Sequence, residues 1–175
     1  MMQEESLPPG ISIVTADNFE EWQMDIRVLD DNPLYKGQTY RLKFTFSSKY
    51  PIGLVYPSLS SSFTRLYNRF DFANSTIGIA EPPEVQFIEC PETREHARIH
   101  IPMHPHVYSN GIICLDLLGY AGWAPFQTVE GVCLSLQSML TANNRNERPP
   151  GDAEFVSFNR KRPRDINFQY EDDNV

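Results

Sequence analysis

Two stretches of strictly alternating side chains constrain the fold of this chain more than any other feature. In residues 22–28 apolar and polar residues alternate, and the apolar set is Trp22, Met24, Ile26 and Val28. Residues 40–46 repeat the pattern, with Tyr40, Leu42, Phe44 and Phe46 as the apolar set. A period of two places successive side chains on opposite faces of an extended chain. Two half-buried strands joined by a short polar loop predict an antiparallel meander, with a third strand at residues 85–88.

The bulk numbers predict a single globular domain over residues 1–175. Hydrophobic residues make up 41% and charged residues 22% of the chain, which are ordinary values for one core of this size. We expect this core over about residues 11–160. Residues 1–10 are too short and proline-rich for a stable helix, and residues 11–20 show no clear period. Residues 161–175 are a tail that either packs as a strand or stays mobile.

Residues 53–80 interrupt the regular pattern. They are rich in serine and aromatic residues and show no sustained period of two or 3.6. A structureless loop of this length is uncommon inside a compact domain, although its closure costs little free energy. Without it, Ile52 would run directly into the proline-rich bend at residues 81–84. We interpret residues 53–80 as an insertion, either a genuine loop or a segment that does not belong to the mature chain.

Charge and composition exclude several classes of protein. The formal net charge of −8 argues against a nucleic-acid-binding surface, which needs a basic face. The sequence has neither an early signal-peptide-like apolar run nor an apolar stretch near 18 residues, so we expect no membrane association. The three cysteines form no CxxC pair and cannot all pair with one another. Free thiols then predict a reducing compartment, the cytoplasm or the nucleus.

The three thiols lie in different sequence contexts. Cys133 falls on the apolar stripe of a helix predicted after Thr128 and ending at Asn143, so a packed structural thiol is expected there. Cys90 follows the third strand and has no obvious partner. Cys114 lies on an irregular loop with Pro105 and an Asn-Gly turn before it, and there a reactive and a buried structural thiol are about equally expected. A second short helix is predicted from Asp152 as N-cap through Asn159, with Phe155 and Phe158 facing inward.

Four histidines near this loop suggest a metal site or a Cys–His hydrolase. They are His96, His100, His104 and His106. Pro102 and Pro105 forbid the helix that would align them, and no CxxC completes a tetrahedral set, so metal binding is disfavoured. A Cys–His hydrolase needs a base within hydrogen-bond reach of the thiol, which His104 or His106 could supply, but the sequence carries no cysteine-protease signature.

Several motifs together resemble the ubiquitin-conjugating enzyme family. They are HPHVYSNG, then ICLD around Cys114, then Trp123 and Pro125 heading a helix. The segments YPI and EPPEVQF also resemble the family's proline-rich strand connection, here split by the insertion. The match runs from about Trp22 to the C-terminus. HPHVYSNG, RPPGD and the tail NFQYEDDNV are similar to the W-type branch, which carries a histidine where most relatives have the asparagine of His-Pro-Asn.

The resemblance implies an α/β (α+β) fold, a four-stranded antiparallel meander with an active-site loop and flanking helices. It also implies an acyltransferase that accepts ubiquitin from the activating enzyme as a thioester and transfers it to a substrate amine, in the W-type branch a protein's N-terminal α-amine. Cys114 would be the nucleophile, His106 would stabilise the oxyanion or brace the loop, and His104 would be architectural. Asp116 would orient the amine, Asn110 belongs to the turn, and Glu147 could replace the family's acidic gate residue.

The implied partners are ubiquitin, the activating enzyme, protein substrates and a RING or U-box ubiquitin ligase. The expected ligase-contact residues are Pro82, Pro83, Trp123, Ala124 and Pro125. No cofactor is expected, because ATP is used by the activating enzyme and the chain has no glycine-rich phosphate loop. The family's first helix, which helps to dock the activating enzyme, has no counterpart in residues 1–10. A non-catalytic binding module of the same fold, or a carrier of a ubiquitin-like modifier, are the alternative interpretations.

Overall fold

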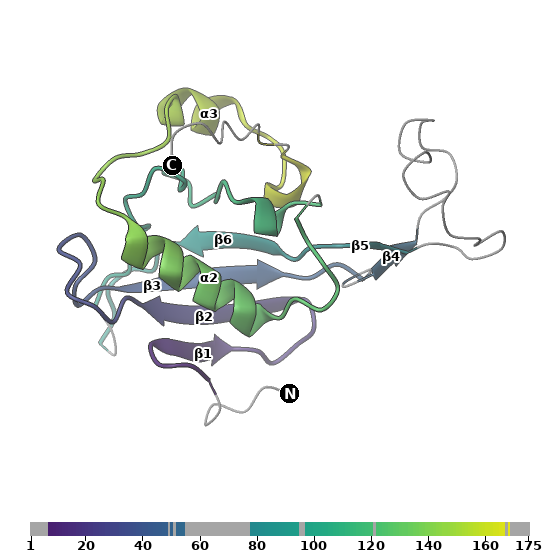
Figure 1. The fold of residues 1–175 in the computed structure, drawn as a ribbon, viewed down its shortest axis with the longest axis horizontal. Coiled ribbons are helices and arrows are strands. Elements are labelled where there is room, and N and C mark those ends of the chain that lie inside the picture. Colours follow the sequence, from purple (N-terminus) through teal and green to yellow (C-terminus); the bar gives the residue numbers. More distant parts are fainter. Residues whose placement is uncertain are drawn as a thin grey trace.

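A four-stranded antiparallel sheet forms the centre of the molecule in a computed structural model (Figure 1). The structure describes residues 7–48, 50, 52–54, 78–94, 97–120, 122–166 and 168. The strand order is β1-β2-β3-β6, so the sheet is a meander interrupted only by the excursion between β3 and β6. The strands are β1 (Ile11–Thr15), β2 (Glu21–Arg27), β3 (Thr39–Thr45) and β6 (Glu84–Ile88). The meander and the strands predicted at residues 22–28, 40–46 and 85–88 are confirmed.

The register of the strands gathers the alternating apolar residues on one face. Met24 lies opposite Leu42, and Leu42 lies opposite Phe87 on the next strand. All three side chains are at most 1% exposed. A slip of one residue would turn each strand's apolar set to solvent, so burial of this face specifies the register.

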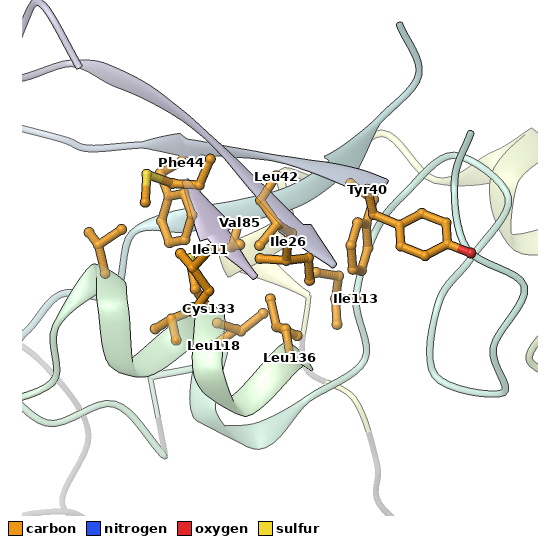
Figure 2. Packing of buried hydrophobic residues seen from close by; sticks show 14 of the residues in the cluster. Ile11, Ile26, Tyr40, Leu42, Phe44, Val85, Ile113, Leu118, Cys133 and Leu136 are labelled. Carbon is orange, nitrogen blue, oxygen red and sulfur yellow. The ribbon is translucent and has the colours of Figure 1, made fainter. Parts of the chain in front are cut away.

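Helix α2 (Val129–Ala142) covers the apolar face (Figures 1 and 2). Its buried side chains recur at helical spacing and face the sheet; they are Val129, Val132, Cys133, Leu136 and Leu140. Thr128 is the predicted N-cap, and its hydroxyl accepts a hydrogen bond from the backbone N–H of Gly131 at 3.0 Å. The helix ends at Asn143, as predicted, where the side chain of Asn32 donates to the Asn143 carbonyl oxygen at 2.8 Å.

Strand β1 is an element that the sequence pattern did not predict. Only Ile11 is buried within it, Ile13 packs partly against the core, and a register irregularity follows Ile13. A five-residue edge strand with one buried side chain carries too little alternation to be recognised. The helix side chain of Gln137 holds its entry, donating to the carbonyl oxygens of Pro9 at 3.1 Å and Arg27 at 2.7 Å.

The insertion leaves the sheet as a two-stranded ribbon. Strand β4 (Ile52–Leu54) pairs antiparallel with β5 (Gly78–Ala80), so the chain departs and returns at one place. This pairing places Ile52 opposite Ala80, next to the proline-rich bend that leads into β6. Residues 55–77, the greater part of the predicted insertion, lie outside the described residues.

The C-terminal region differs from the prediction in two respects. Helix α3 (Asp152–Phe158) begins after Gly151 in the left-handed conformation, so Asp152 is its first residue and not its N-cap. Phe158 is 77% exposed, so its predicted inward orientation is wrong, whereas Phe155 is half-buried. The described part of the tail forms a 3₁₀ turn, η3 (Pro163–Asp165), and contains no strand; residues 169–175 lie outside the description.

At the other end, residues 7–10 enter β1 directly. Residues 1–6 are not described, so the expected absence of a first helix is tested only from Leu7 onward. A search of the described residues finds no helix long and apolar enough to cross a membrane.

Truncation of the core residue Leu136 tests the packing of α2 on the sheet. Leu136 is fully buried, so Leu136→Ala removes apolar contacts and leaves a cavity that should lower the free energy of unfolding by about 2–5 kcal/mol. Leu134→Ala is the matched control, because Leu134 is 38% exposed on the same helix and should lose about 1 kcal/mol or less. Urea unfolding measures both, and equal losses would contradict this packing.

Candidate functional site

Cys114 is the last paired residue of a small hairpin. Val107 forms a bridge with Ile113, and the backbone N–H of Cys114 donates to the carbonyl oxygen of His106 at 2.8 Å. The N–H of Tyr108 donates to Ile112 at 2.9 Å, which closes the pairing around the turn. The thiol is partly exposed. Cys114 is therefore held by backbone pairing, although the sequence indicated an irregular loop.

The turn of this hairpin is seated on β6. The carbonyl oxygen of Gly111 accepts the N–H of Phe87 at 2.9 Å, and the side chain of Gln86 donates to the carbonyl oxygen of Asn110 at 2.6 Å. Gly111 has a φ of +86°, and a Cβ built there would lie 1.9 Å from the carbonyl oxygen of Phe87. Only glycine fits this position, because both the conformation and the close approach exclude a side chain.

His104 braces the entrance of the hairpin from inside. Its ring is 4% exposed, Nδ1 accepts the backbone N–H of His106 at 2.9 Å, and Nε2 lies 3.3 Å from the carbonyl oxygen of Met139 on α2. Both contacts are satisfied when the neutral ring carries its hydrogen on Nε2. Burial, followed by the charge of His106, lowers the pKa of His104 to about 4. His104 is therefore a neutral hydrogen-bonding group at physiological pH.

His106 occupies the hairpin strand beside the thiol and is exposed. Its carbonyl oxygen holds the N–H of Cys114, so its backbone helps to place the nucleophile candidate. Its ring centroid lies 5.5 Å from that of His104. The backbone of His106 is thus held by the hairpin, and its side chain is exposed to solvent.

The structure adds two polar residues that the sequence did not single out as site residues. The guanidinium of Arg148 donates to the carbonyl oxygens of Pro102 at 2.5 Å, Val107 at 3.0 Å and Ile101 at 3.3 Å. The carboxylate of Asp152 accepts the backbone N–H of Ser109 at 2.7 Å. Both fasten the hairpin to the C-terminal region. The only sequence signal was their place in the RPPGD motif.

An aromatic stack was also missed. The ring of Tyr108 lies 3.9 Å from that of Phe155 on α3 and 6.0 Å from that of Phe168, centroid to centroid. Burial raises the pKa of Tyr108, and the nearby charges of Cys114 and Asp152 add to the effect. The stack therefore lies close enough to Cys114 for the two groups to interact electrostatically.

Asp116 lies just after the hairpin that carries Cys114. Asp116 is exposed and begins the 3₁₀ turn η2 (Asp116–Leu118), and its carbonyl oxygen accepts the N–H of Gly119 at 2.9 Å. Glu147 is exposed and lies 3.7 Å from the guanidinium of Arg145. The structure thus brings Asn110, His104 and His106 into one hairpin with Cys114, and places Asp116 two residues beyond it.

The residues predicted to contact a ligase divide by exposure. Pro82, Pro83 and Trp123 are buried, Ala124 is half-buried and Pro125 is exposed. Phe126, next in the chain, is 85% exposed. The ring centroid of Trp123 lies 6.0 Å from that of Tyr50, which lines a cavity of about 620 Å³ together with Phe19, Trp22, Phe46 and Val129. Only part of the predicted set is thus available for direct contact.

The other two thiols have environments unlike that of Cys114. Cys133 is fully buried, and burial, with a smaller effect from Glu130, raises its pKa to about 12, which agrees with its predicted structural role. Cys90 is half-buried, with the guanidinium of Arg41 3.7 Å from its sulfur. The described residues contain no group of three His, Cys, Asp or Glu side chains arranged to hold a metal ion, and His96 lies outside them.

Comparisons with known proteins point to one family. Residues 80–171 match the family described as "Ubiquitin-conjugating enzyme". The chain is 34% identical over 169 residues to a "Probable ubiquitin-conjugating enzyme E2 W" of Dictyostelium discoideum, covering 96% of this chain and 87% of that protein. It is 33% identical to a "Probable ubiquitin-conjugating enzyme E2 W-A" of Danio rerio, over 95% and 86%. The crystal structure of the ubiquitin conjugating enzyme E2 UbcA1 from Agrocybe aegerita superposes with a TM-score of 0.66 at 32% identity, covering 91% of this chain and 88% of that one.

Substitution of Gly111 tests the seating of the turn. Gly111→Ala should destabilise the protein by about 3 kcal/mol or more, because it adds a backbone clash to the unfavourable left-handed conformation. Gly37→Ala is the control, since Gly37 has a φ of +73° with nothing within 4 Å of a new Cβ, and it should lose only about 1–2 kcal/mol. Denaturant unfolding that gave the two variants the same stability would contradict the close approach.

The pKa of His104 predicts a dependence of stability on pH. Because the folded pKa is about 4 and the ordinary value is 6.5, the unfolded state binds the extra proton first as pH falls. Stability should therefore decrease from pH 6.5 to 4, by up to about 3 kcal/mol from this group. His104→Gln has no titrating ring, so its unfolding free energy should fall less over this range. Parallel stability–pH curves for the two proteins would show that His104 is not held neutral.

Proposed function

The chain belongs to the ubiquitin-conjugating enzyme family and is similar to its W-type branch, and from this membership we propose that Cys114 carries ubiquitin as a thioester. The protein is, by this family membership, a transferase that acts in ubiquitin transfer. The observation that carries the assignment of Cys114 is its position. Cys114 is partly exposed, and it is the last paired residue of a hairpin whose backbone is held by hydrogen bonds. Cys133 is excluded by complete burial and a raised pKa. Cys90 lies after β6, where it pairs with Ile99 and is not part of this hairpin.

The reaction proposed for Cys114 is a transthioesterification followed by aminolysis. The Cys114 thiolate attacks the C-terminal glycine carbonyl of ubiquitin on the activating enzyme, a new C–S bond forms, and the activating enzyme's thiolate leaves. An acceptor amine then attacks the same carbonyl, an amide forms, and the Cys114 thiolate leaves. The proton lost by the amine passes to solvent or to a nearby base.

The hairpin supports this chemistry through fixed positions. Proximity and orientation accelerate acyl transfer only where the nucleophile is held in place, and Cys114 is held by the His106 carbonyl and the seated turn. The exposed imidazole of His106 supplies an N–H that can face the oxyanion of the tetrahedral intermediate. Asp116, exposed two residues after Cys114, is the residue proposed to orient the incoming amine. His104 is a positioning residue, because the hydrogen-bond partners of its ring are backbone groups of His106 and Met139.

The acceptor proposed is the α-amine at a protein's N-terminus. An α-amine has a pKa of about 8 and is partly deprotonated near neutrality, whereas a lysine near 10.4 is almost fully protonated. The more nucleophilic α-amine requires less assistance. The names of the W-type relatives do not state this preference, and it rests on the chemistry and on the family resemblance.

The proposed partners are those of the family's general reaction. Ubiquitin and its activating enzyme charge the thiol, and a ubiquitin ligase brings the acceptor. The exposed Pro125 and the half-buried Ala124 are available to a ligase, while Pro82, Pro83 and Trp123 shape the surface from beneath.

Charging followed by discharge tests this function. Incubation with activating enzyme, ATP and ubiquitin should give an adduct on a non-reducing gel that thiols remove. Cys114→Ala should abolish the adduct, whereas the matched Cys90→Ala should retain it. An adduct that persisted in Cys114→Ala would assign the thioester elsewhere.

The charged enzyme then reports its acceptor. Discharge to a peptide with a free α-amine should exceed discharge to the same peptide acetylated at its N-terminus with an internal lysine, by about tenfold at neutral pH. Equal rates would refute the α-amine preference while leaving Cys114 as the carrier.

A further inference from the structure

A buried arginine joins the C-terminal segment to the proline-rich bend. The side chain of Arg164, on η3, is 3% exposed. Its Nη1 lies 2.6 Å from Glu81 and its Nε lies 2.7 Å from Glu84, and these carboxylates are 13% and 15% exposed. The two glutamates flank Pro82 and Pro83 at the start of β6. One guanidinium therefore holds two carboxylates in a nearly dry site, with distances at the short end for charge-assisted hydrogen bonds.

This arginine clamp, made of Arg164, Glu81 and Glu84, fixes a segment that packs against the two neighbours of Cys114. A small cavity of about 20 Å³, room for roughly one water molecule, remains at the contact. Its walls from the C-terminal segment are Pro163, Ile166 and Phe168, and those facing them include Pro83, Ile113 and Leu115. Ile113 and Leu115 are the two neighbours of Cys114. The clamped segment is thus packed directly against the part of the chain that carries the nucleophile candidate.

The same segment completes the aromatic stack. Phe168 lies 6.0 Å from Tyr108 and 6.3 Å from Phe155, ring centroid to ring centroid, and Tyr108 belongs to the hairpin strand whose His106 pairs with Cys114. In Figure 1 the chain leaves α3 and returns to the start of β6, so Phe168 follows the point where Arg164 is anchored. Only three residues separate Arg164 from Phe168 in the sequence, so the anchored turn lies close to the stack.

We propose that Arg164 is a positioning residue for the transfer step, which holds the C-terminal segment so that Phe168 and Tyr108 form a fixed wall for the acceptor peptide beside Cys114. This inference rests on the proposed function of Cys114. An ion pair suits the task, because the guanidinium of Arg164 is buried and is unfavourable without its carboxylate partners. Glu84 also lies 3.6 Å from the exposed guanidinium of Arg162, so Arg164 is its closer and less exposed partner. The acceptor chemistry is that of a polypeptide whose residues next to the reacting amine lie across an aromatic surface.

The experiment compares acceptors that need the wall with one that does not. Arg164→Met removes the charge while keeping an apolar side chain. Arg160→Met is the matched control, because Arg160 is exposed and, among the described residues, donates to the carbonyl oxygens of Ser157 and Asn159. Each protein is charged with ubiquitin and then discharged to hydroxylamine or to an α-amine peptide. In Arg164→Met the KM for the peptide should rise about tenfold, with kcat, charging and hydroxylamine discharge within about twofold of the wild type.

A second variant keeps the test valid if Arg164→Met fails to fold. Phe168→Ala leaves the clamp intact and should reproduce the selective rise in peptide KM. Arg164→Lys should be intermediate, because a single ammonium cannot reach both carboxylates as the planar fork does. A parallel loss of peptide and hydroxylamine discharge, or an unchanged peptide KM in Phe168→Ala, would overturn the proposal. Failure of the wild-type protein to form an adduct would instead overturn the proposed function itself.

Discussion

The backbone contact between Gly111 and β6 is the constraint on which the site depends. The carbonyl oxygen of Gly111 accepts the N–H of Phe87 at a place where no Cβ fits, so the turn cannot shift without losing contact with the sheet. Three residues along the hairpin, Cys114 is paired to His106. The thiol thereby takes its position from a strand of the central sheet, β6, whose Val85 and Phe87 are buried in the core.

Polar contacts from α2 and from the C-terminal region also hold the hairpin in place. His104 bridges the hairpin to α2 through a neutral ring. Arg148 donates to the carbonyl oxygen of Val107 in the hairpin and to those of Ile101 and Pro102 just before it. Asp152 ties the C-terminal region to the hairpin, and the Arg164 clamp ties the same region to the proline-rich bend before β6. Each satisfies backbone or carboxylate groups that would be costly to bury alone. The site is thus a partly exposed cysteine on a hairpin whose position is fixed by hydrogen bonds to the rest of the protein.

Local patterns in the sequence predicted the frame but not its long-range polar contacts. The period of two gave β2 and β3, and the apolar stripe with Thr128 gave α2, because these elements bury one regular face. Strand β1 was missed because its alternation is carried by too few residues. Asp152 was predicted as a helix cap because aspartate favours that position, but its carboxylate serves Ser109 across 43 positions.

The candidate site shows the same division. Cys114 and His104 stood out because turn chemistry and proline surround them, whereas Arg164 has no local signal, and the motifs that contain Arg148 and Phe168 do not show what these residues contact. Their partners lie far along the chain, as Arg164 and Glu81 do at a separation of 83 positions. Phe158 was predicted inward by its spacing of three from Phe155, but it is the last residue of α3, a helix that buries no side chain completely.

Identification of the residue that bears the thioester tests the account most directly. Intact-mass measurement of the charged protein, followed by peptide mapping under non-reducing acidic conditions, locates the acyl group among the three cysteines. The account predicts one ubiquitin per chain, attached to the sulfur of Cys114. An adduct on Cys90, or one that is amide-linked and stable to thiols, would contradict it.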